Sequence, residues 1–216
     1  MTVLITGANR GIGKALFDGY AQRGQPVIGT HRAADNGAMR QLDVTDATSH
    51  AALVDRLGET SLDLLICNAG IYPDKGETLD TGYAAAMWAE GFATNVTGVF
   101  LTVQHLLPAL RRAGSAKIAI ISSQMASNTR APGSSYIYRA SKAAALNLGR
   151  NLATDLAADG IAVGIYHPGW VQTDMGGDTA DIDTATCIAG LMDRFDALSL
   201  RTTGCFETWD GKAHPY

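Results

Sequence analysis

Residues 2–13 read Thr2-Val3-Leu4-Ile5-Thr6-Gly7-Ala8-Asn9-Arg10-Gly11-Ile12-Gly13, a strand-like run that passes through a glycine-rich turn into a helical segment. Short β-branched runs and longer alanine- and leucine-rich segments then alternate along the chain. This alternation predicts strands at Thr2–Thr6, Pro26–Thr30, Arg40–Asp43, Leu62–Cys67, Lys117–Ser122 and Ala162–Tyr166. It predicts helices at Gly11–Arg23, Thr45–Gly58, Thr81–Ala93, Asn95–Ala113, Tyr136–Asp159 and Thr184–Ala197. Strands followed by helices throughout indicate a doubly wound α/β fold.

Several predicted strands are almost continuously apolar, which is typical of strands that are buried on both faces. Leu62–Cys67 and Lys117–Ser122 show this pattern most clearly. Such strands belong to a parallel sheet that helices cover on both sides. The 216 residues suffice for one domain with a full core, and no linker, repeat or low-complexity tract divides them. We therefore expect a single Rossmann-like domain.

Composition and charge exclude several function classes. Hydrophobic residues make up 46% of the chain and charged residues 18%, an ordinary globular balance. The net charge of -4 argues against a nucleic-acid partner, which requires a basic face. The longest mainly apolar stretch, Val96 to Leu110, is interrupted by polar residues and is short for a membrane span. No signal segment is visible, so we expect a cytoplasmic protein.

Cysteines and histidines are scattered. Cys67, Cys187 and Cys205 form no C-x-x-C pair, and we expect them in the core of a protein in a reducing compartment. The five histidines form no ligand-like cluster, so we expect no metal site.

The turn after the first strand predicts dinucleotide binding. Glycines let the backbone approach a phosphate, and the amino end of a helix offers free N–H groups and a positive dipole. After the second strand comes Arg32, and Arg10 lies in the glycine turn. A cation at this place accommodates the extra phosphate of NADP, whereas a carboxylate would hold the ribose hydroxyls of NAD. We therefore favour NADP over NAD.

Tyr138 and Lys142 stand four residues apart in a predicted helix, which brings both side chains to one face. An ammonium beside a phenol favours the phenolate, so we expect the pKa of Tyr138 to fall below its usual value of about 10. Such a tyrosine can give or take a proton near neutral pH, as redox chemistry at a carbonyl requires.

Together these pieces resemble the short-chain dehydrogenase/reductase family, and the match covers nearly the whole chain. The matching positions are the glycine turn from Thr6 to Gly13, Asp43, Asn68-Ala69-Gly70, Asn95, Ser123, Tyr138 with Lys142, and Pro168-Gly169 with Thr173. The residues around Tyr138 and from His167 to Gly177 are similar to the subgroup that contains the bacterial C-factor proteins and the fly carbonyl reductase Sniffer.

The resemblance implies a catalytic set of Asn95, Ser123, Tyr138 and Lys142. Tyr138 would protonate the carbonyl oxygen, Lys142 would lower its pKa and hold the nicotinamide ribose, and Ser123 would donate a hydrogen bond to the same oxygen. Asn95 would anchor a water that links Lys142 to solvent. The implied cofactor-binding residues are Gly7, Asn9, Arg10, Gly11, Ile12, Gly13, Arg32, Asp43, Val44, Asn68, Ala69, Gly70, Tyr138, Lys142, Pro168, Gly169, Val171 and Thr173.

Two departures from the family pattern concern the substrate side. Ser123 precedes Tyr138 by two residues more than is usual; the usual spacing falls on Met125, and Ser122, Ser134 and Ser135 are weaker alternatives. The segment from Asp174 to Thr184 is also short. We expect an open substrate site formed by loops near residues 123–137 and 168–184, with Met125, Trp170 and Met175 either lining it or serving as ordinary packing.

The sequence thus predicts an NADP-dependent oxidoreductase that reduces a ketone or aldehyde to an alcohol, or runs in reverse. The alternative is a cofactor-binding signalling protein of C-factor type that needs no turnover. The sugar epimerase and dehydratase relatives have a longer carboxyl-terminal region than this chain. The expected small-molecule partner is a carbonyl or alcohol substrate. We expect the chain to form a homodimer or, as the alternative, a homotetramer. We expect it to bind neither nucleic acid nor a membrane.

Overall fold

Seven parallel strands form one sheet in the computed structural model, which describes residues 1–216. The strands are β1 (Val3–Ile5), β2 (Val27–His31), β3 (Met39–Gln41), β4 (Leu64–Cys67), β5 (Lys117–Ile121), β6 (Ala162–His167) and β7 (Phe206–Thr208). Their order in the sheet is β3-β2-β1-β4-β5-β6-β7, and each neighbouring pair is parallel. The predicted doubly wound α/β fold is confirmed.

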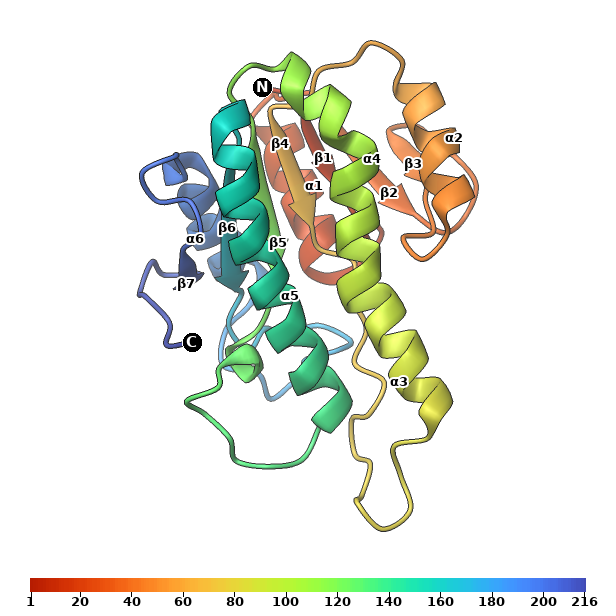
Figure 1. Cartoon of the computed structure of the whole chain (residues 1–216), viewed down its shortest axis with the longest axis vertical. Coiled ribbons are helices and arrows are strands. Elements are labelled where there is room, and N and C mark those ends of the chain that lie inside the picture. Colours follow the sequence, from red (N-terminus) through yellow and green to blue (C-terminus); the bar gives the residue numbers. More distant parts are fainter.

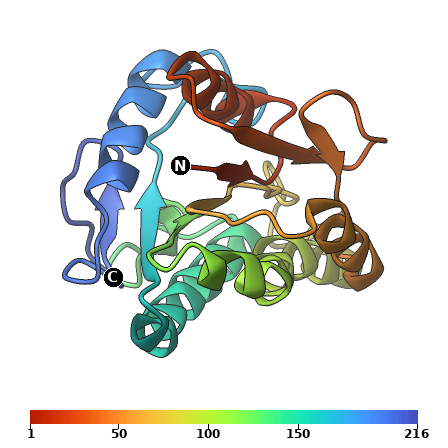
Figure 2. The ribbon, with the colours of Figure 1, turned by 90° about the horizontal axis from the view of Figure 1, so that it is seen from above.

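The protein has six α-helices, α1 (Gly11–Gln22), α2 (Ala47–Leu57), α3 (Ala85–Phe92), α4 (Gly98–Arg112), α5 (Tyr136–Leu156) and α6 (Thr184–Ala197). All but α3 cover the sheet in two layers (Figures 1 and 2). Figure 2 shows α1 and α6 on one face and α2, α4 and α5 on the other. None of the helices is long and apolar enough to cross a membrane.

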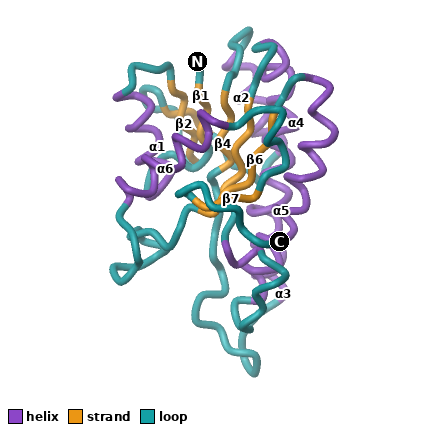
Figure 3. The backbone as a smooth tube through the Cα atoms, turned by 90° about the vertical axis from the view of Figure 1, so that its left-hand side faces the viewer, coloured by secondary structure: helices purple, strands orange, loops and turns teal.

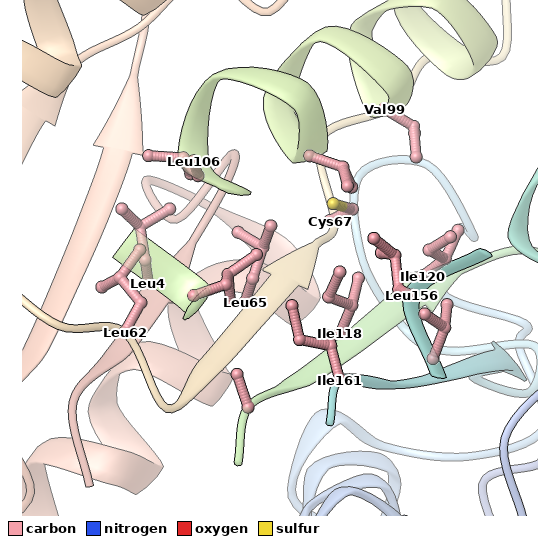
Figure 4. Packing of buried hydrophobic residues seen from close by; sticks show 14 of the residues in the cluster. Leu4, Leu62, Leu65, Cys67, Val99, Leu106, Ile118, Ile120, Leu156 and Ile161 are labelled. Carbon is pink, nitrogen blue, oxygen red and sulfur yellow. The ribbon is translucent and has the colours of Figure 1, made fainter. Parts of the chain in front are cut away.

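Each face of the sheet has its own hydrophobic core. The larger cluster has 24 buried residues and lies between the sheet and the layer of α2, α4 and α5. In Figure 4, Leu65 of β4 and Ile118 and Ile120 of β5 lie among side chains of this cluster. The smaller cluster, of 15 residues, lies under α1 and α6. The central strands therefore supply side chains to both cores, as their apolar sequences predict.

The strand order reverses between β1 and β4, which lie side by side with Ile5 opposite Ile66. The chain leaves β1 toward β2 and β3, then returns across the sheet to β4, β5 and β6. At such a switch point the loops that follow the two neighbouring strands diverge, and a crevice opens at the carboxyl ends of the strands. Figure 3 shows loops gathered below the strands.

Four elements differ from their predictions. Strand β7 was not predicted, because this three-residue edge strand contains Glu207 and has little apolar character. Helix α3 begins at Ala85 rather than Thr81, because Tyr83 has a φ of 64, a left-handed conformation that cannot continue a helix. The predicted helix from Asn95 begins as a π-helical turn, Ala93–Thr97, before α4. Helix α5 ends at Leu156 rather than Asp159, because the last three predicted residues form a 3-10 turn, Ala157–Asp159. The remaining elements match their predicted ranges to within two residues at each end.

Candidate active site

A cavity of about 510 Å³ lies at the switch point, at the carboxyl ends of the strands. Most of the predicted cofactor residues line it: Gly7, Asn9, Arg10, Gly11, Ile12, Gly13, Arg32, Asp43, Val44, Asn68, Ala69, Gly70, Tyr138, Lys142, Pro168 and Thr173. Two others do not. Val171 is buried and pairs with Ile182, and Gly169 packs against Ile182 and Trp209.

The glycine turn brings β1, α1 and the loop after β4 into close contact. Gly7 and Gly11 have φ values of 65 and 53, the left-handed region that favours glycine. A Cβ atom on Gly13 would lie 2.2 Å from the carbonyl oxygen of Gly7 and 2.4 Å from Nδ2 of Asn68. That Nδ2 donates hydrogen bonds to the carbonyl oxygens of Thr6 (2.9 Å) and Gly7 (3.1 Å).

The amino end of α1 fits a phosphate. Arg10 precedes the helix without capping it, and the amide groups of Gly11, Ile12 and Gly13 donate no hydrogen bond within the protein. Three free N–H groups and the helix dipole therefore face the cavity. This is the environment that a dinucleotide pyrophosphate requires.

Positive charge follows β2. Arg32 is exposed and lines the cavity. The next carboxylate along the chain, Asp35, lies 4.0 Å from Arg40 and 3.5 Å from Arg56 and is therefore already paired. Arg10 lies across the cavity mouth, where it makes an exposed ion pair of 3.4 Å with Asp174.

Asp43 lies just before α2 but does not cap it. Its Oδ1 accepts hydrogen bonds from the amide (2.9 Å) and the hydroxyl (2.7 Å) of Thr45, whereas Asp46 is the residue that caps α2. Asp43 therefore shapes the turn that lines the cavity after β3.

Tyr138 and Lys142 lie one turn apart on α5, and both are buried. The Nζ atom of Lys142 is 5.6 Å from the centroid of the Tyr138 ring and donates a hydrogen bond of 3.0 Å to the carbonyl oxygen of Ile121. Their placement on one helix face agrees with the spacing.

The predicted fall in the pKa of Tyr138 is wrong for this structure. Burial raises the pKa of the Tyr138 phenol to about 12; the nearby Ser123 side chain opposes this rise, and the neighbouring Tyr72 adds to it. Burial also lowers the pKa of Lys142 to about 8. The sequence shows the spacing of the pair but not that both groups are removed from water, and desolvation is the larger effect.

Ser123 lies two residues beyond the end of β5 and is 7% exposed. Its Oγ accepts a hydrogen bond of 3.1 Å from the amide of Met125, and its side chain is near enough to the phenol of Tyr138 to lower the pKa of that phenol. Ser122 instead donates to the backbone carbonyl of Lys142 (3.1 Å), and Ser134 and Ser135 precede α5. The inserted residues between Ser123 and Tyr138 thus leave the two side chains near each other.

Asn95 sits in the π-helical turn and is 1% exposed. Its Oδ1 accepts from the amide of Ile71, and its Nδ2 donates to the carbonyl of Ile71, both at 2.9 Å. Nδ2 also donates to Oγ of Ser141 at 3.0 Å. The side chain therefore joins the loop after β4 to α5, beneath Lys142.

The sequence analysis missed several residues around Tyr138. Tyr72 stacks on the phenol ring, with centroids 4.2 Å apart, and Asp74 binds the backbone of α5. Ile121, Glu90, Thr94 and Asp174 also line the cavity. Met175, which the sequence offered as a possible lining residue, lines it too, and so does Ser122, which the sequence offered as an alternative to Ser123. Adjacency to the predicted motifs could have indicated Ile121, but no sequence signal connects Asp74 with a helix 63 residues later. Trp170 is exposed and does not line the cavity.

Comparisons with known proteins agree with this geometry. The family model described as short chain dehydrogenase matches residues 1–183. The C-signal of Myxococcus xanthus is 35% identical over 158 residues, which cover 72% of this chain and 93% of that protein. The 1-hydroxy-2-glutathionyl-2-methyl-3-butene dehydrogenase of Rhodococcus sp. (strain AD45) is 33% identical over 225 residues, or 97% of each chain.

Solved structures give the same result. The NADPH-bound carbonyl reductase from chicken fatty liver superposes with a TM-score of 0.90 and 31% identity, covering 100% of this chain and 98% of that one. The carbonyl reductase Sniffer of D. melanogaster has a TM-score of 0.89 and 26% identity, covering 100% and 99%. The chain therefore belongs to the short-chain dehydrogenase/reductase family of oxidoreductases, in the group that contains C-signal and the Sniffer-like carbonyl reductases.

Proposed function

We propose that the chain is an NADPH-dependent carbonyl reductase that converts a ketone or aldehyde to an alcohol. The observation that supports this most strongly is the buried Tyr138 phenol, whose pKa the nearby Ser123 lowers and which lies one helical turn from Lys142 beside a dinucleotide-sized cavity. When bound, the cofactor supplies the hydride. The free amide groups after Arg10 hold its pyrophosphate.

The chain's own residues supply the proton and the electrostatic stabilisation. The phenol of Tyr138 donates a proton to the carbonyl oxygen as negative charge develops there, while Ser123 donates a hydrogen bond to the same oxygen. Lys142 holds the nicotinamide ribose, and its positive charge favours the phenolate that remains after proton transfer. Asn95 anchors a water from which the phenolate recovers its proton through Lys142. The substrate enters between residues 123–137 and 168–184.

Turnover by a Tyr138→Phe variant tests this function. Purified protein with NADPH, and separately NADH, is assayed against ketones, aldehydes and quinones by the loss of cofactor absorbance. General acid catalysis contributes about 10²- to 10⁴-fold, so we expect a loss in kcat of that size while NADPH affinity stays within about threefold. A Tyr138→Phe protein that turns over as fast as the unmutated chain contradicts the assigned chemistry.

The preference for NADP is tested at Arg32. A charge-assisted hydrogen bond stabilises by about 1.5–3 kcal/mol, so Arg32→Asp should weaken NADPH binding by about 10- to 100-fold. NADH binding should stay within about threefold of its starting value. Arg201→Asp is the matched control, because Arg201 is also exposed but does not line the cavity. Equal NADPH affinity in both variants shows that Arg32 is only a surface charge.

The likeness to C-signal supports a second function, in which the chain binds the cofactor and signals without turnover. The two functions differ in what Tyr138→Phe does in cells that lack the chain. If signalling is the role, this variant restores the missing phenotype as well as the unmutated chain does. If reduction is the role, it does not.

A further inference from the structure

The start of α5, which holds Tyr138, is not capped by its own sequence. Ser135 occupies the N-cap position but has φ 52 and ψ 41, and its side chain makes no capping hydrogen bond. Ser134 is also left-handed, with a φ of 58. Two consecutive non-glycine residues in this region are unfavourable and persist only where surrounding structure holds them.

Asp74, in the segment between β4 and α3, supplies the missing cap. Its Oδ2 accepts a hydrogen bond of 2.8 Å from the amide of Ile137, and its Oδ1 accepts one of 3.2 Å from the amide of Tyr138 itself. Asp74 is 1% exposed and lies in no ion pair, so these amide groups and the helix dipole are what stabilise the buried carboxylate.

Two tyrosines of the same segment bind the same turn. The ring of Tyr72 stacks on Tyr138, with 18° between the planes, and its hydroxyl is hydrogen-bonded with Oγ of Ser135. The hydroxyl of Tyr83 accepts from the amide of Ser135 at 3.2 Å. Figure 1 shows this segment hanging at the lower end of the molecule, beside the first turn of α5.

We propose that Asp74 is the positioning residue that fixes Tyr138 for proton transfer, with Tyr72 and Tyr83 completing the contact. The backbone amide of Tyr138 is bound directly, so a shift of Asp74 shifts the phenol relative to Ser123 and the substrate carbonyl. Displacements of about 1 Å can slow an enzyme by about 100-fold. This inference rests on the proposed role of Tyr138 as the general acid.

Asp74→Ala, Asp74→Asn and Asp46→Ala form the test series. Asp46 caps α2 through Oδ1 and the amide of Thr48 at 2.9 Å, so its loss removes a bond of the same kind elsewhere. For Asp74→Ala we expect a fall in kcat of about 100-fold with KM for NADPH within about threefold. Asn keeps one acceptor oxygen and should restore kcat to within about 10-fold of the unmutated chain. Asp46→Ala should leave kcat within about twofold.

Amide hydrogen exchange at Ile137 and Tyr138 supplies a readout that does not depend on turnover. We expect protection of these two amides to fall by about 10-fold or more in Asp74→Ala and to be unaffected in Asp46→Ala. Unchanged protection overturns the proposal, and so does an unchanged kcat with lost protection. The Tyr138→Phe variant tests the proposed function separately. If that variant is fully active, Tyr138 is not the general acid and the proposed function fails. The exchange data still show whether Asp74 holds the backbone of Tyr138.

Discussion

At the scale of single residues, Lys142 shows how burial and charge oppose each other in the site. The ammonium is 5% exposed and has one hydrogen bond, to the carbonyl of Ile121. Burial lowers its pKa from 10.5 to about 8, so at pH 7 the folded protein keeps a charge in surroundings that disfavour it. The buried charge of Lys142 therefore lowers the stability of the folded protein, but it places a cation beside the phenol of Tyr138.

We predict that Lys142→Met stabilises the protein at pH 7 while abolishing turnover. The lowered pKa corresponds to about 3 kcal/mol, and the lost hydrogen bond offsets about 1 kcal/mol, which leaves a gain of about 2 kcal/mol. Between pH 8 and 10.5 the unfolded chain binds more protons than the folded one, so the stability of the unmutated protein rises with pH and the difference shrinks.

Urea unfolding at pH 7 and pH 10 measures this difference. Lys14→Met is the control, because Lys14 is exposed and pairs only with Asp18; we expect a change below about 0.5 kcal/mol there. A Lys142→Met protein that is less stable at pH 7 would show that the ammonium stabilises the fold.

At the scale of elements, the sequence predicts what depends on local signals. Helix α6 has its predicted bounds, Thr184–Ala197, because Asp183 caps it through the amide of Thr186, three residues later. The start of α3 and the cap of α5 depend instead on Tyr83 and Asp74, whose partners lie 52 and 63 residues away. The cavity could be predicted because it follows from what stands at each strand end, whereas the pKa values could not, because they depend on burial.

We predict that Gly13→Ala separates α1 from the turn after β4. The new Cβ would lie 2.2 Å from the carbonyl oxygen of Gly7 and 2.4 Å from Asn68, atoms that hydrogen bonds hold in place. Overpacking of this kind lowers the free energy of unfolding by about 1–3 kcal/mol. The displaced amide groups should also weaken NADPH binding by at least about 10-fold. Thermal unfolding and cofactor fluorescence measure the two effects.

Gly19→Ala is the matched control in the same helix. Its Cβ would meet only the flexible ends of Met192 (3.0 Å) and Ile188 (3.4 Å). The helix propensity of alanine offsets that contact by up to about 1 kcal/mol, so we expect little change in stability or in NADPH binding. Equal effects of the two substitutions would mean that the close contacts of Gly13 with Gly7 and Asn68 do not limit the size of the side chain at this position.

At the scale of the whole molecule, the carboxyl-terminal segment ties the edge of the sheet to the loop after β5. The amide of His214 donates to the carbonyl of Phe206 in β7 at 2.8 Å, and the carbonyl of Tyr216 accepts from the amide of Thr129 at 3.1 Å. His167, at the end of β6, packs edge-on against His214, with ring centroids 5.9 Å apart. Both histidines are buried, and Nδ1 of His167 has no hydrogen-bond partner.

His167 should therefore make the fold sensitive to acid. Its pKa is lowered to about 4 by burial and then by the nearby His214 and Arg130, against a smaller opposite effect of Asp210. As pH falls from 6.5 toward 4, the unfolded chain takes up a proton that the folded chain does not, and stability is lost. From pH 7 to pH 4.5 this amounts to about 2–3 kcal/mol.

Glutamine does not titrate in this range, so we predict that His167→Gln loses about 2–3 kcal/mol less stability than the unmutated chain over the same pH change. Urea unfolding at pH 7 and pH 4.5 measures both proteins. Because all seven strands share one sheet, protonation at the end of β6 should lower the stability of the whole domain rather than release the tail alone. Equal losses in the two proteins would show that carboxylates elsewhere govern the acid transition.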